Sequence, residues 1–366
     1  MAGKTPSQAP SLSAIMPNYI KELVKSACEH DASDLFLSEG SIPRMKIFGI
    51  VHVCGDRYVT RDELAEFWTL CRADADVDSD KDSAYVADNG TRFRVNCHKH
   101  SGKLGAVLRL IKRAVPAIGS LGLPVHVLTH WLEKTNGLML VTGPTGAGKS
   151  TTLAACLEWI NERKNYHVVT IEDPMEYEFF PNKSFFTQRE VGRDTPSFAS
   201  GLRSALRQAP DIIFLGEIRD AETAVTALQA AETGHLVFGS LHSATVTDAL
   251  ERFMHLIDQT QREGVQTLLS YQLIGILSQQ LLPGTHGDES VVVCEHLDVQ
   301  AAARDWIREM KLPELREFMQ RKDSALNRTF TDSLVEAYQA GRISFDTAMA
   351  HSGNPYEFTR ILRGIS

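Results

Sequence analysis

The chain of 366 residues is poor in cysteine, and its six cysteines are spread from Cys28 to Cys294 without a single C-x-x-C pair. A disulfide framework or a zinc ribbon requires cysteines at closer spacing. The distribution therefore predicts reduced, buried thiols in a cytosolic protein.

Long apolar segments are missing as well. Residues 1–16 are rich in Ser, Pro and Ala and lack the apolar centre of a signal peptide, so we expect a flexible tail there. Two long uncharged stretches, 114–132 and 264–287, are interrupted by Pro and Gly or by four Gln residues, which a bilayer disfavours. The sequence thus predicts a soluble protein in the cytoplasm.

Positive charge is in deficit, with 38 Lys and Arg against 46 Asp and Glu, a net charge of −8. A chain this acidic is a poor candidate for coating nucleic acid through phosphate contacts. The hydrophobic fraction of 43% and the charged fraction of 23% are ordinary for globular proteins, and the length suggests two or three domains. We therefore expect a multidomain globular protein without a nucleic-acid partner.

Residues 17–115 mix short strands and helices without strict alternation, which predicts a small α+β domain. The expected helices are 17–29 and 62–71, and the expected strands are 34–37, 46–53, 92–97 and 106–111. Aspartates at alternate positions from Asp74 to Asp82 predict an exposed acidic turn rather than a calcium loop, because the sixth position is Ser79 instead of Gly. Residues 116–125, rich in Pro and Gly, predict a linker.

Residues 126–299 change character. Near-continuous apolar strands alternate with helices, which predicts an α/β domain with a parallel sheet covered on both faces. The expected strands are 137–142, 168–171, 212–215 and 236–241, with helices at 152–163, 197–208, 221–232 and 245–257. Residues 300–366 are more charged and read as a C-terminal helical subdomain.

The segment that follows the strand 137–142 reads GPTGAGKS and fits the pattern G-x-x-x-x-G-K-[ST]. Its glycines let backbone N–H groups turn toward phosphates at a helix N-terminus. Lys149 would contact the β- and γ-phosphates, and the Ser150 hydroxyl would ligate Mg²⁺. The predicted nucleotide-binding residues are Gly143, Pro144, Thr145, Gly146, Ala147, Gly148, Lys149, Ser150 and Thr151.

Three other expected strands also end in polar residues. These residues are Glu172, Glu176, Glu217 and His242. Ligands of open α/β sheets bind beyond the carboxyl ends of the strands, so we expect these side chains to converge with Lys149. Phosphoryl transfer needs a carboxylate that orients the attacking water, and Glu217, at the end of an apolar strand, is the first choice.

His235 and His242 lie seven residues apart around the strand 236–241. An odd spacing places their side chains on opposite faces, which argues against a shared metal ion. Sensing of the γ-phosphate by one of them, or a structural histidine, both remain open.

Further motifs extend over most of the chain. Residues 206–220 read LRQAPDIIFLGEIRD, 170–178 are acidic, and 231–242 run from AETGH to His242. Together with the phosphate loop they resemble the secretion ATPase family of type II secretion and type IV pilus systems, although Phe214 replaces an aliphatic residue. ASDL at 32–35 and RFRVN at 92–96 resemble its retraction branch, the PilT and PilU type of twitching-motility ATPases.

The resemblance implies a PAS-like N-terminal domain and a RecA-like ATPase domain that hold ATP and Mg²⁺ between them. By this likeness Glu217 is the catalytic carboxylate and Glu176 a candidate general base. Arg94 and Arg109 match arginines that face the phosphates, with a solvated strand arginine as the alternative. A third family arginine falls where this chain has Asn136, which cannot offer a charged bidentate fork, so the rate of hydrolysis comes into question.

The same likeness implies a homohexameric motor that hydrolyses Mg·ATP and powers type IV pilus retraction. It would lie in the cytoplasm, peripheral to the inner membrane, where it meets an inner-membrane pilus platform protein and, where one exists, a paralogous retraction ATPase. Residues 302–309 (AARDWIRE) look like a degenerate form of the C-terminal motif linked to retraction. Two alternatives remain: an accessory PilU-like ring with weak hydrolysis of its own, or a related secretion or pilus assembly ATPase.

Overall fold

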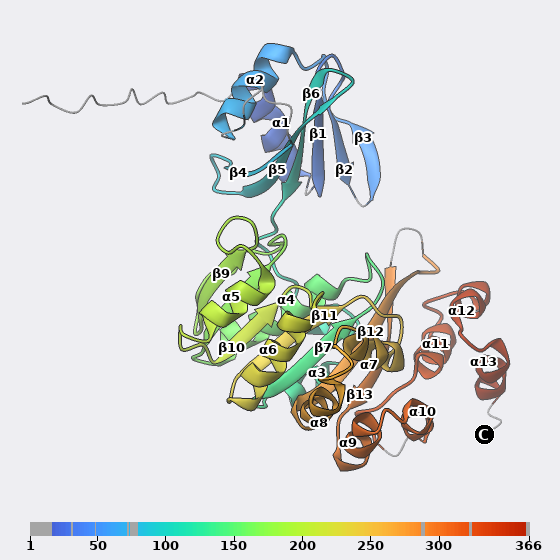
Figure 1. The fold of residues 1–366 in the computed structure, drawn as a ribbon. Helices are drawn as coiled ribbons and strands as arrows, with labels where there is room; N and C mark the ends of the chain where they lie inside the picture. The colour runs from blue at the N-terminus through green and yellow to red at the C-terminus, as the bar shows by residue number, and fades with distance from the viewer. Residues whose placement is uncertain are drawn as a thin grey trace, which may run out of the picture. The chain divides into compact units, whose positions relative to one another are not determined.

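The computed structural model describes residues 17–363 except 31, 48, 72, 74–79, 287–289 and 322–323. The chain divides between Arg113 and Ala114 into two compact units, whose elements Figure 1 labels. Among the described helices, none combines the length and the apolar character that a membrane span requires.

The first unit is an antiparallel sheet with two helices, in the strand order β3-β2-β1-β6-β5-β4. Its elements are α1 (Asn18–Glu29), β1 (Asp34–Ser38), β2 (Arg44–Ile47), β3 (Ile50–Val53), α2 (Arg61–Leu70), β4 (Lys81–Val86), β5 (Arg92–His100) and β6 (Lys103–Leu110). Helix α1 buries Ile20, Leu23 and Val24 at helical spacing. The predicted mixture of strands and helices is confirmed for this half.

Two details of that half differ from the sequence-based expectation. The single strand expected over 46–53 is two strands, because the chain reverses between Ile47 and Ile50 and the two residues pair across the hairpin. Of the acidic residues expected in a turn, Asp74, Asp76 and Asp78 lie outside the described residues. Asp82 belongs to β4, where it pairs with Asn96 of β5.

The second unit is built on a seven-stranded sheet in the order β13-β12-β7-β11-β10-β8-β9. Its strands are β7 (Gly137–Thr142), β8 (His167–Glu172), β9 (Phe185–Glu190), β10 (Ile212–Leu215), β11 (Leu236–Leu241), β12 (Leu273–Pro283) and β13 (Ser290–Asp298). All neighbours are parallel except β12 and β13, so the α/β class is confirmed but the sheet is mixed rather than wholly parallel.

Helices cover both faces of this sheet, as the apolar strands predict. On β7, Leu138 and Leu140 face one buried cluster, while Met139 and Val141 face the other. The first cluster contains α5 (Phe198–Ala205), α6 (Ala221–Glu232), α7 (Val246–His255), α8 (Arg262–Gln272), α9 (Ala301–Arg308) and α10 (Leu312–Gln320). The second contains α3 (Val125–Leu132) and α4 (Lys149–Arg163), which lie behind the sheet in Figure 1.

Two segments at the borders of the expected domains pack onto this unit. Within 116–125, the short helix η1 (Ile118–Ser120) and Leu123 join the cluster of α3 and α4. At the other end, α11 (Phe330–Gln339), α12 (Phe345–His351) and α13 (Pro355–Leu362) pack against β12 and β13 through Leu282, Val293 and Phe358. The C-terminal helices are therefore anchored to the sheet that carries the phosphate loop.

Candidate nucleotide-binding site

The loop between β7 and α4 has the backbone conformation that its glycines allow. Gly148, the residue before the first turn of α4, has φ of 84°, in the left-handed region that disfavours side chains. A Cβ atom on Gly143 would collide with the carbonyl oxygen of Gln279. Because the first N–H groups of a helix have no partner within it, the start of α4 favours an anion.

Strand β12 holds this loop in place. The Gln279 side chain is buried, donates from Nε2 to the Ala147 carbonyl at 2.6 Å and accepts at Oε1 from the Thr152 hydroxyl at 2.8 Å. Just before the loop, the hydroxyl of Thr142 at the end of β7 lies 2.6 Å from the hydroxyl of Ser278 on β12. The sequence analysis missed β12 and therefore these contacts, which tie both ends of the loop to a strand more than a hundred residues away.

Lys149 folds back over the loop. Its Nζ donates to the carbonyl oxygens of Gly143 and Pro144, each at 3.0 Å, and lies 3.3 Å from Nδ1 of His242. Burial lowers the pKa of this ammonium, while the charges of Glu217 and Glu176 act in the opposite direction. The lysine is thus a desolvated cation with two nearby carboxylates, which suits it to contact phosphate.

Glu217 follows β10 and faces the same lysine. Its Oε2 lies 3.5 Å from Nε2 of His242 and accepts a hydrogen bond from Nε of Arg219 at 2.8 Å. Arg219 also donates to Asp173 at 3.2 Å, and the two carboxylates raise the pKa of its guanidinium. The structure therefore brings Lys149, Glu217 and His242 together at the carboxyl ends of three strands. Arg219 was not predicted, although it lies in the run that contains Glu217.

The two predicted carboxylates at the end of β8 and just after it differ in their exposure to solvent. Glu172 is buried and accepts from the Thr170 hydroxyl at 2.8 Å and from the backbone N–H of Glu176. Burial is the main cause that raises the pKa of Glu172 to about 7. Glu176 itself is exposed, and the Tyr177 hydroxyl beside it lies 3.0 Å from Thr151 Oγ1 on α4. Glu172 thus fixes the backbone at Glu176, which remains free to face solvent or ligand.

Two residues from the sequence analysis lie at the opposite end of the sheet. His235 precedes β11, and its Nδ1 is 2.9 Å from the Ala230 carbonyl at the end of α6. Asn136 precedes β7 and donates to the Ala231 carbonyl at 3.3 Å. The length of β11 separates His235 from His242 by roughly 20 Å. Neither His235 nor Asn136 therefore reaches the phosphate loop of its own subunit, and Asn136 bonds the end of α6 instead.

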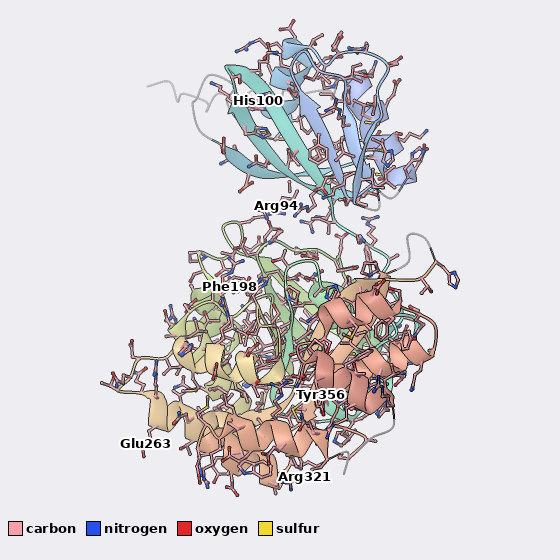
Figure 2. The ribbon with its side chains drawn as sticks, turned by 90° about the vertical axis from the view of Figure 1, so that its right-hand side faces the viewer. Arg94, His100, Phe198, Glu263, Arg321 and Tyr356 are labelled. Atoms are coloured by element: carbon pink, nitrogen blue, oxygen red, sulfur yellow. The ribbon has the colours of Figure 1, made fainter. Side chains whose placement is uncertain are left out.

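The arginines Arg94 and Arg109 belong to the first unit, where β5 and β6 place them directly opposite each other. Arg94, labelled in Figure 2, pairs with Asp82 at 3.4 Å, and Arg109 pairs with Asp34 at 2.8 Å. Each is thus engaged in an ion pair within its own unit. Their predicted role toward phosphates is a proposal taken up below.

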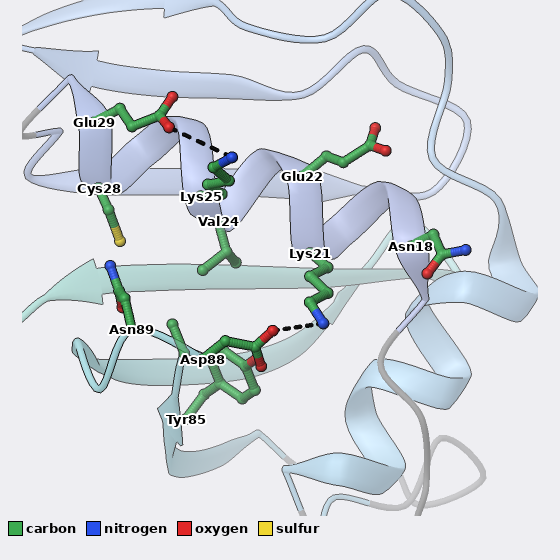
Figure 3. A pocket seen from close by; sticks show the side chains of 11 residues that line it. Asn18, Lys21, Glu22, Val24, Lys25, Cys28, Glu29, Tyr85, Asp88 and Asn89 are labelled. Atoms are coloured by element: carbon green, nitrogen blue, oxygen red, sulfur yellow. Dashed lines mark ion pairs between the residues drawn. The ribbon is translucent and has the colours of Figure 1, made fainter.

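Two of the cavities that the described residues line are large enough to hold a small molecule. One, of about 660 Å³, opens beside the phosphate loop. It is lined by Pro144, Thr145, His242, Ser243, Ala244, Arg252, Gln280 and His351. The other, of about 630 Å³, lies in the first unit between α1 and the end of β4, where Lys21 and Asp88 pair at 2.5 Å (Figure 3). It contains none of the predicted site residues.

Comparison with known proteins gives matches over most of the chain. The family model described as "Type II/IV secretion system protein" matches residues 80–343. The chain is 36% identical over 344 residues to the "Type IV pilus retractation ATPase PilT" of Pseudomonas aeruginosa, covering 93% of this chain and 99% of that one. It is 34% identical over 350 residues to the "Type IV pilus ATPase PilU" of the same organism, covering 94% and 91%. A crystal structure of the pilus retraction motor PilT with bound ADP superposes with a TM-score of 0.85 at 41% identity, covering 93% and 99%.

Proposed function

The chain belongs to the type II/IV secretion system protein family as an ATPase of the PilT and PilU type, and from this premise we propose that it is a motor of type IV pilus retraction. The observation that carries the proposal is the contact of Lys149 with His242 and of His242 with Glu217 at the edge of one sheet. A complete phosphate loop beside a strand-end carboxylate supports turnover of ATP rather than nucleotide binding alone.

Mg²⁺ would be held mainly by the phosphates of the nucleotide, with the Ser150 hydroxyl as the protein ligand. Ser150 is the second residue of α4, is half-buried, and makes no side-chain hydrogen bond to another described residue. Among the described residues no cluster of three His, Cys, Asp or Glu side chains is arranged around a metal site. Mg²⁺ characteristically binds substrate phosphates and one or two protein oxygens, so this donor set fits it, and the ion would neutralise phosphate charge.

The residues of the chain would then divide the work of hydrolysis. The loop 143–151 binds the phosphates through its backbone, and Lys149 exchanges its carbonyl partners for phosphate oxygens. Glu217, held in orientation by Arg219, positions the attacking water, and Glu176 accepts its proton. Arg94 and Arg109 would leave their ion pairs with Asp82 and Asp34 to stabilise the charge of the departing phosphate.

The proposal includes the assembly. We propose a homohexamer in the cytoplasm that works against a platform protein of the inner membrane. On α9, Ala303 and Ile307 are buried, whereas Arg304, Asp305 and Arg308 are exposed and present a charged face to a partner. This face carries the motif that resembles the retraction motif of the family.

A second candidate is an accessory ring with weak hydrolysis of its own. The specific observation in its favour is that the PilU relative is almost as similar to this chain as the PilT relative. Within one subunit Asn136 bonds the Ala231 carbonyl away from the phosphate loop, so its position there does not favour this candidate.

The decisive experiment uses cells whose only copy carries Lys149→Ala, with Lys134→Ala as the control that removes an exposed lysine outside the site. Surface pili are counted and twitching is measured on agar. Abundant pili without twitching support a retraction motor. Bald cells would reassign the protein to pilus assembly, and normal pili with normal twitching would favour the accessory ring.

The purified protein separates turnover from binding. Glu217→Gln keeps the hydrogen bond from Arg219 but cannot act as an anion, so we expect ADP to bind normally while phosphate release falls by about a hundredfold or more. Turnover above a tenth of the wild-type rate would remove Glu217 from its proposed role.

A further inference from the structure

Two histidines of the first unit project from one face of β5. His98 and His100 alternate on this strand, so their rings lie on the same side of the sheet, with centroids 6.0 Å apart. His98 is half-buried, and His100, labelled in Figure 2, is exposed. Neither is among the residues of the candidate nucleotide-binding site. Two neighbouring imidazoles are a ligand set that transition-metal ions favour.

Gly105 on β6 leaves room for both rings. It lies directly opposite His98 of β5, and on its other side it lies directly opposite Ser38 of β1. A Cβ atom on Gly105 would lie 2.8 Å from Nε2 of His98 and 3.3 Å from Cδ2 of His100. The Ser38 hydroxyl lies 2.9 Å from Nε2 of His100. Two imidazoles and a hydroxyl therefore converge over a backbone position that carries no side chain.

A chain of hydrogen bonds fixes how the His98 ring is presented. Asn96 donates from Nδ2 to the Asp82 carboxylate at 3.1 Å, so its Oδ1 faces His98 and accepts from Nδ1 at 3.1 Å. The hydrogen of the neutral ring thus resides on Nδ1, and Nε2 presents its lone pair beside Gly105. Histidines that bind metal ions are held in the same way, because the ring nitrogen that is not a ligand donates to a polar group.

This arrangement suits a cation better than an anion. A neutral imidazole that donates from Nδ1 can only accept at Nε2, and an anionic oxygen, itself an acceptor, gains nothing from it. Lys103 lies opposite His100 on β6, but its ammonium extends toward Gly40, where Nζ would lie 3.7 Å from an added Cβ atom. Imidazole nitrogen suits Zn²⁺, Cu²⁺ and Ni²⁺, whereas Mg²⁺ prefers oxygen ligands.

We propose that His98 and His100 bind one divalent transition-metal ion over Gly105, with the Ser38 hydroxyl and water completing its coordination. The described residues form no cluster of three His, Cys, Asp or Glu side chains around a metal, so a site with two imidazoles leaves coordination positions open to solvent. An ion held there would join β1 and β5 across β6. The proposal is independent of the proposed ATPase function, because it rests on residues of the first unit alone.

The test titrates the purified chain, free of metal and of any histidine tag, with Zn²⁺. His98→Gln and His100→Gln each remove one imidazole, and His52→Gln, which removes an exposed histidine of β3 in the same unit, is the matched control. Gly105→Ala keeps both histidines and fills the space over β6. Competition with a chromogenic chelator gives the number of bound ions and their dissociation constants, and circular dichroism shows whether each variant is folded.

We expect both histidine variants and Gly105→Ala to bind this Zn²⁺ ion at least about tenfold more weakly than the wild type, and His52→Gln to stay within about twofold. Cu²⁺ should bind more tightly than Zn²⁺, and its electron paramagnetic resonance spectrum should show two imidazole nitrogens in the wild type and one in either histidine variant. Affinities of both histidine variants within about twofold of the wild type would overturn the proposal. Unchanged affinity in Gly105→Ala would also overturn it, because the ion would then lie elsewhere.

Discussion

The buried side chain of Gln279 offers a quantitative test of how the phosphate loop is held. Gln279→Met keeps the length of the side chain but removes both hydrogen bonds, the one to the Ala147 carbonyl and the one from the Thr152 hydroxyl. Both partners are only 2% exposed, so water cannot readily replace the lost amide. Each unsatisfied buried group costs about 1–3 kcal/mol, which gives a destabilisation of about 2–6 kcal/mol for the pair.

The effect can be measured as a change in Tm and as a change in the affinity for ADP. A loss of that magnitude in a unit of this size lowers Tm by on the order of 10 °C. Because the loop would no longer be fixed at Ala147, ADP should also bind at least about fivefold more weakly. Differential scanning fluorimetry and ADP titration provide the two values, with Gln229→Met on the exposed face of α6 as the control. A variant destabilised by less than about 1 kcal/mol with unchanged ADP affinity would refute this account of the loop.

Two further predictions concern residues that the structure reinterprets. Burial raises the pKa of Glu172 from its ordinary value of 4.5 to about 7, so the folded protein binds more protons than the unfolded chain and loses stability as pH rises from 4.5 to 7. In the wild type the free energy of unfolding should fall by about 3 kcal/mol across that window, and Glu172→Gln should remove this fall. Urea unfolding at pH 5 and pH 8 gives both free energies, and an equal fall in the wild type and the variant would contradict the prediction. Asn136→Arg should leave phosphate release within twofold of the wild type, because Asn136 bonds the end of α6 at the far edge of the sheet; a several-fold change in turnover would return this position to the active site.

Local chemistry explains which parts of the site the sequence could predict. The phosphate loop carries its own signal, because glycines, lysine and serine stand at fixed spacing within eight residues. Glu217 and His242 could be placed because a parallel sheet brings the carboxyl ends of its strands to one edge. The same rule places His235 and Asn136 at the other edge, because both precede their strands, and this favours the structural alternative for His235.

Strand β12 could not be found in the same way. It begins at Leu273, directly after α8 ends at Gln272, so no turn residue separates helix from strand. Its partners are β7, more than a hundred residues earlier in the chain, and the antiparallel β13. The role of Gln279 follows from this long-range pairing alone, because nothing in the neighbouring residues distinguishes it from Gln280.

The contacts of His242 link the lysine of the loop to the strand-end carboxylate. An ammonium can only donate, so Nδ1 of His242 accepts from Lys149 and the ring hydrogen resides on Nε2, which faces Glu217. If Lys149 exchanges its hydrogen bonds to the carbonyls of Gly143 and Pro144 for bonds to a phosphate, the positive charge next to the His242 ring is partly neutralised. We therefore expect the orientation of Glu217 to depend on occupancy of the loop through His242, with Arg219 as the second contact of this carboxylate.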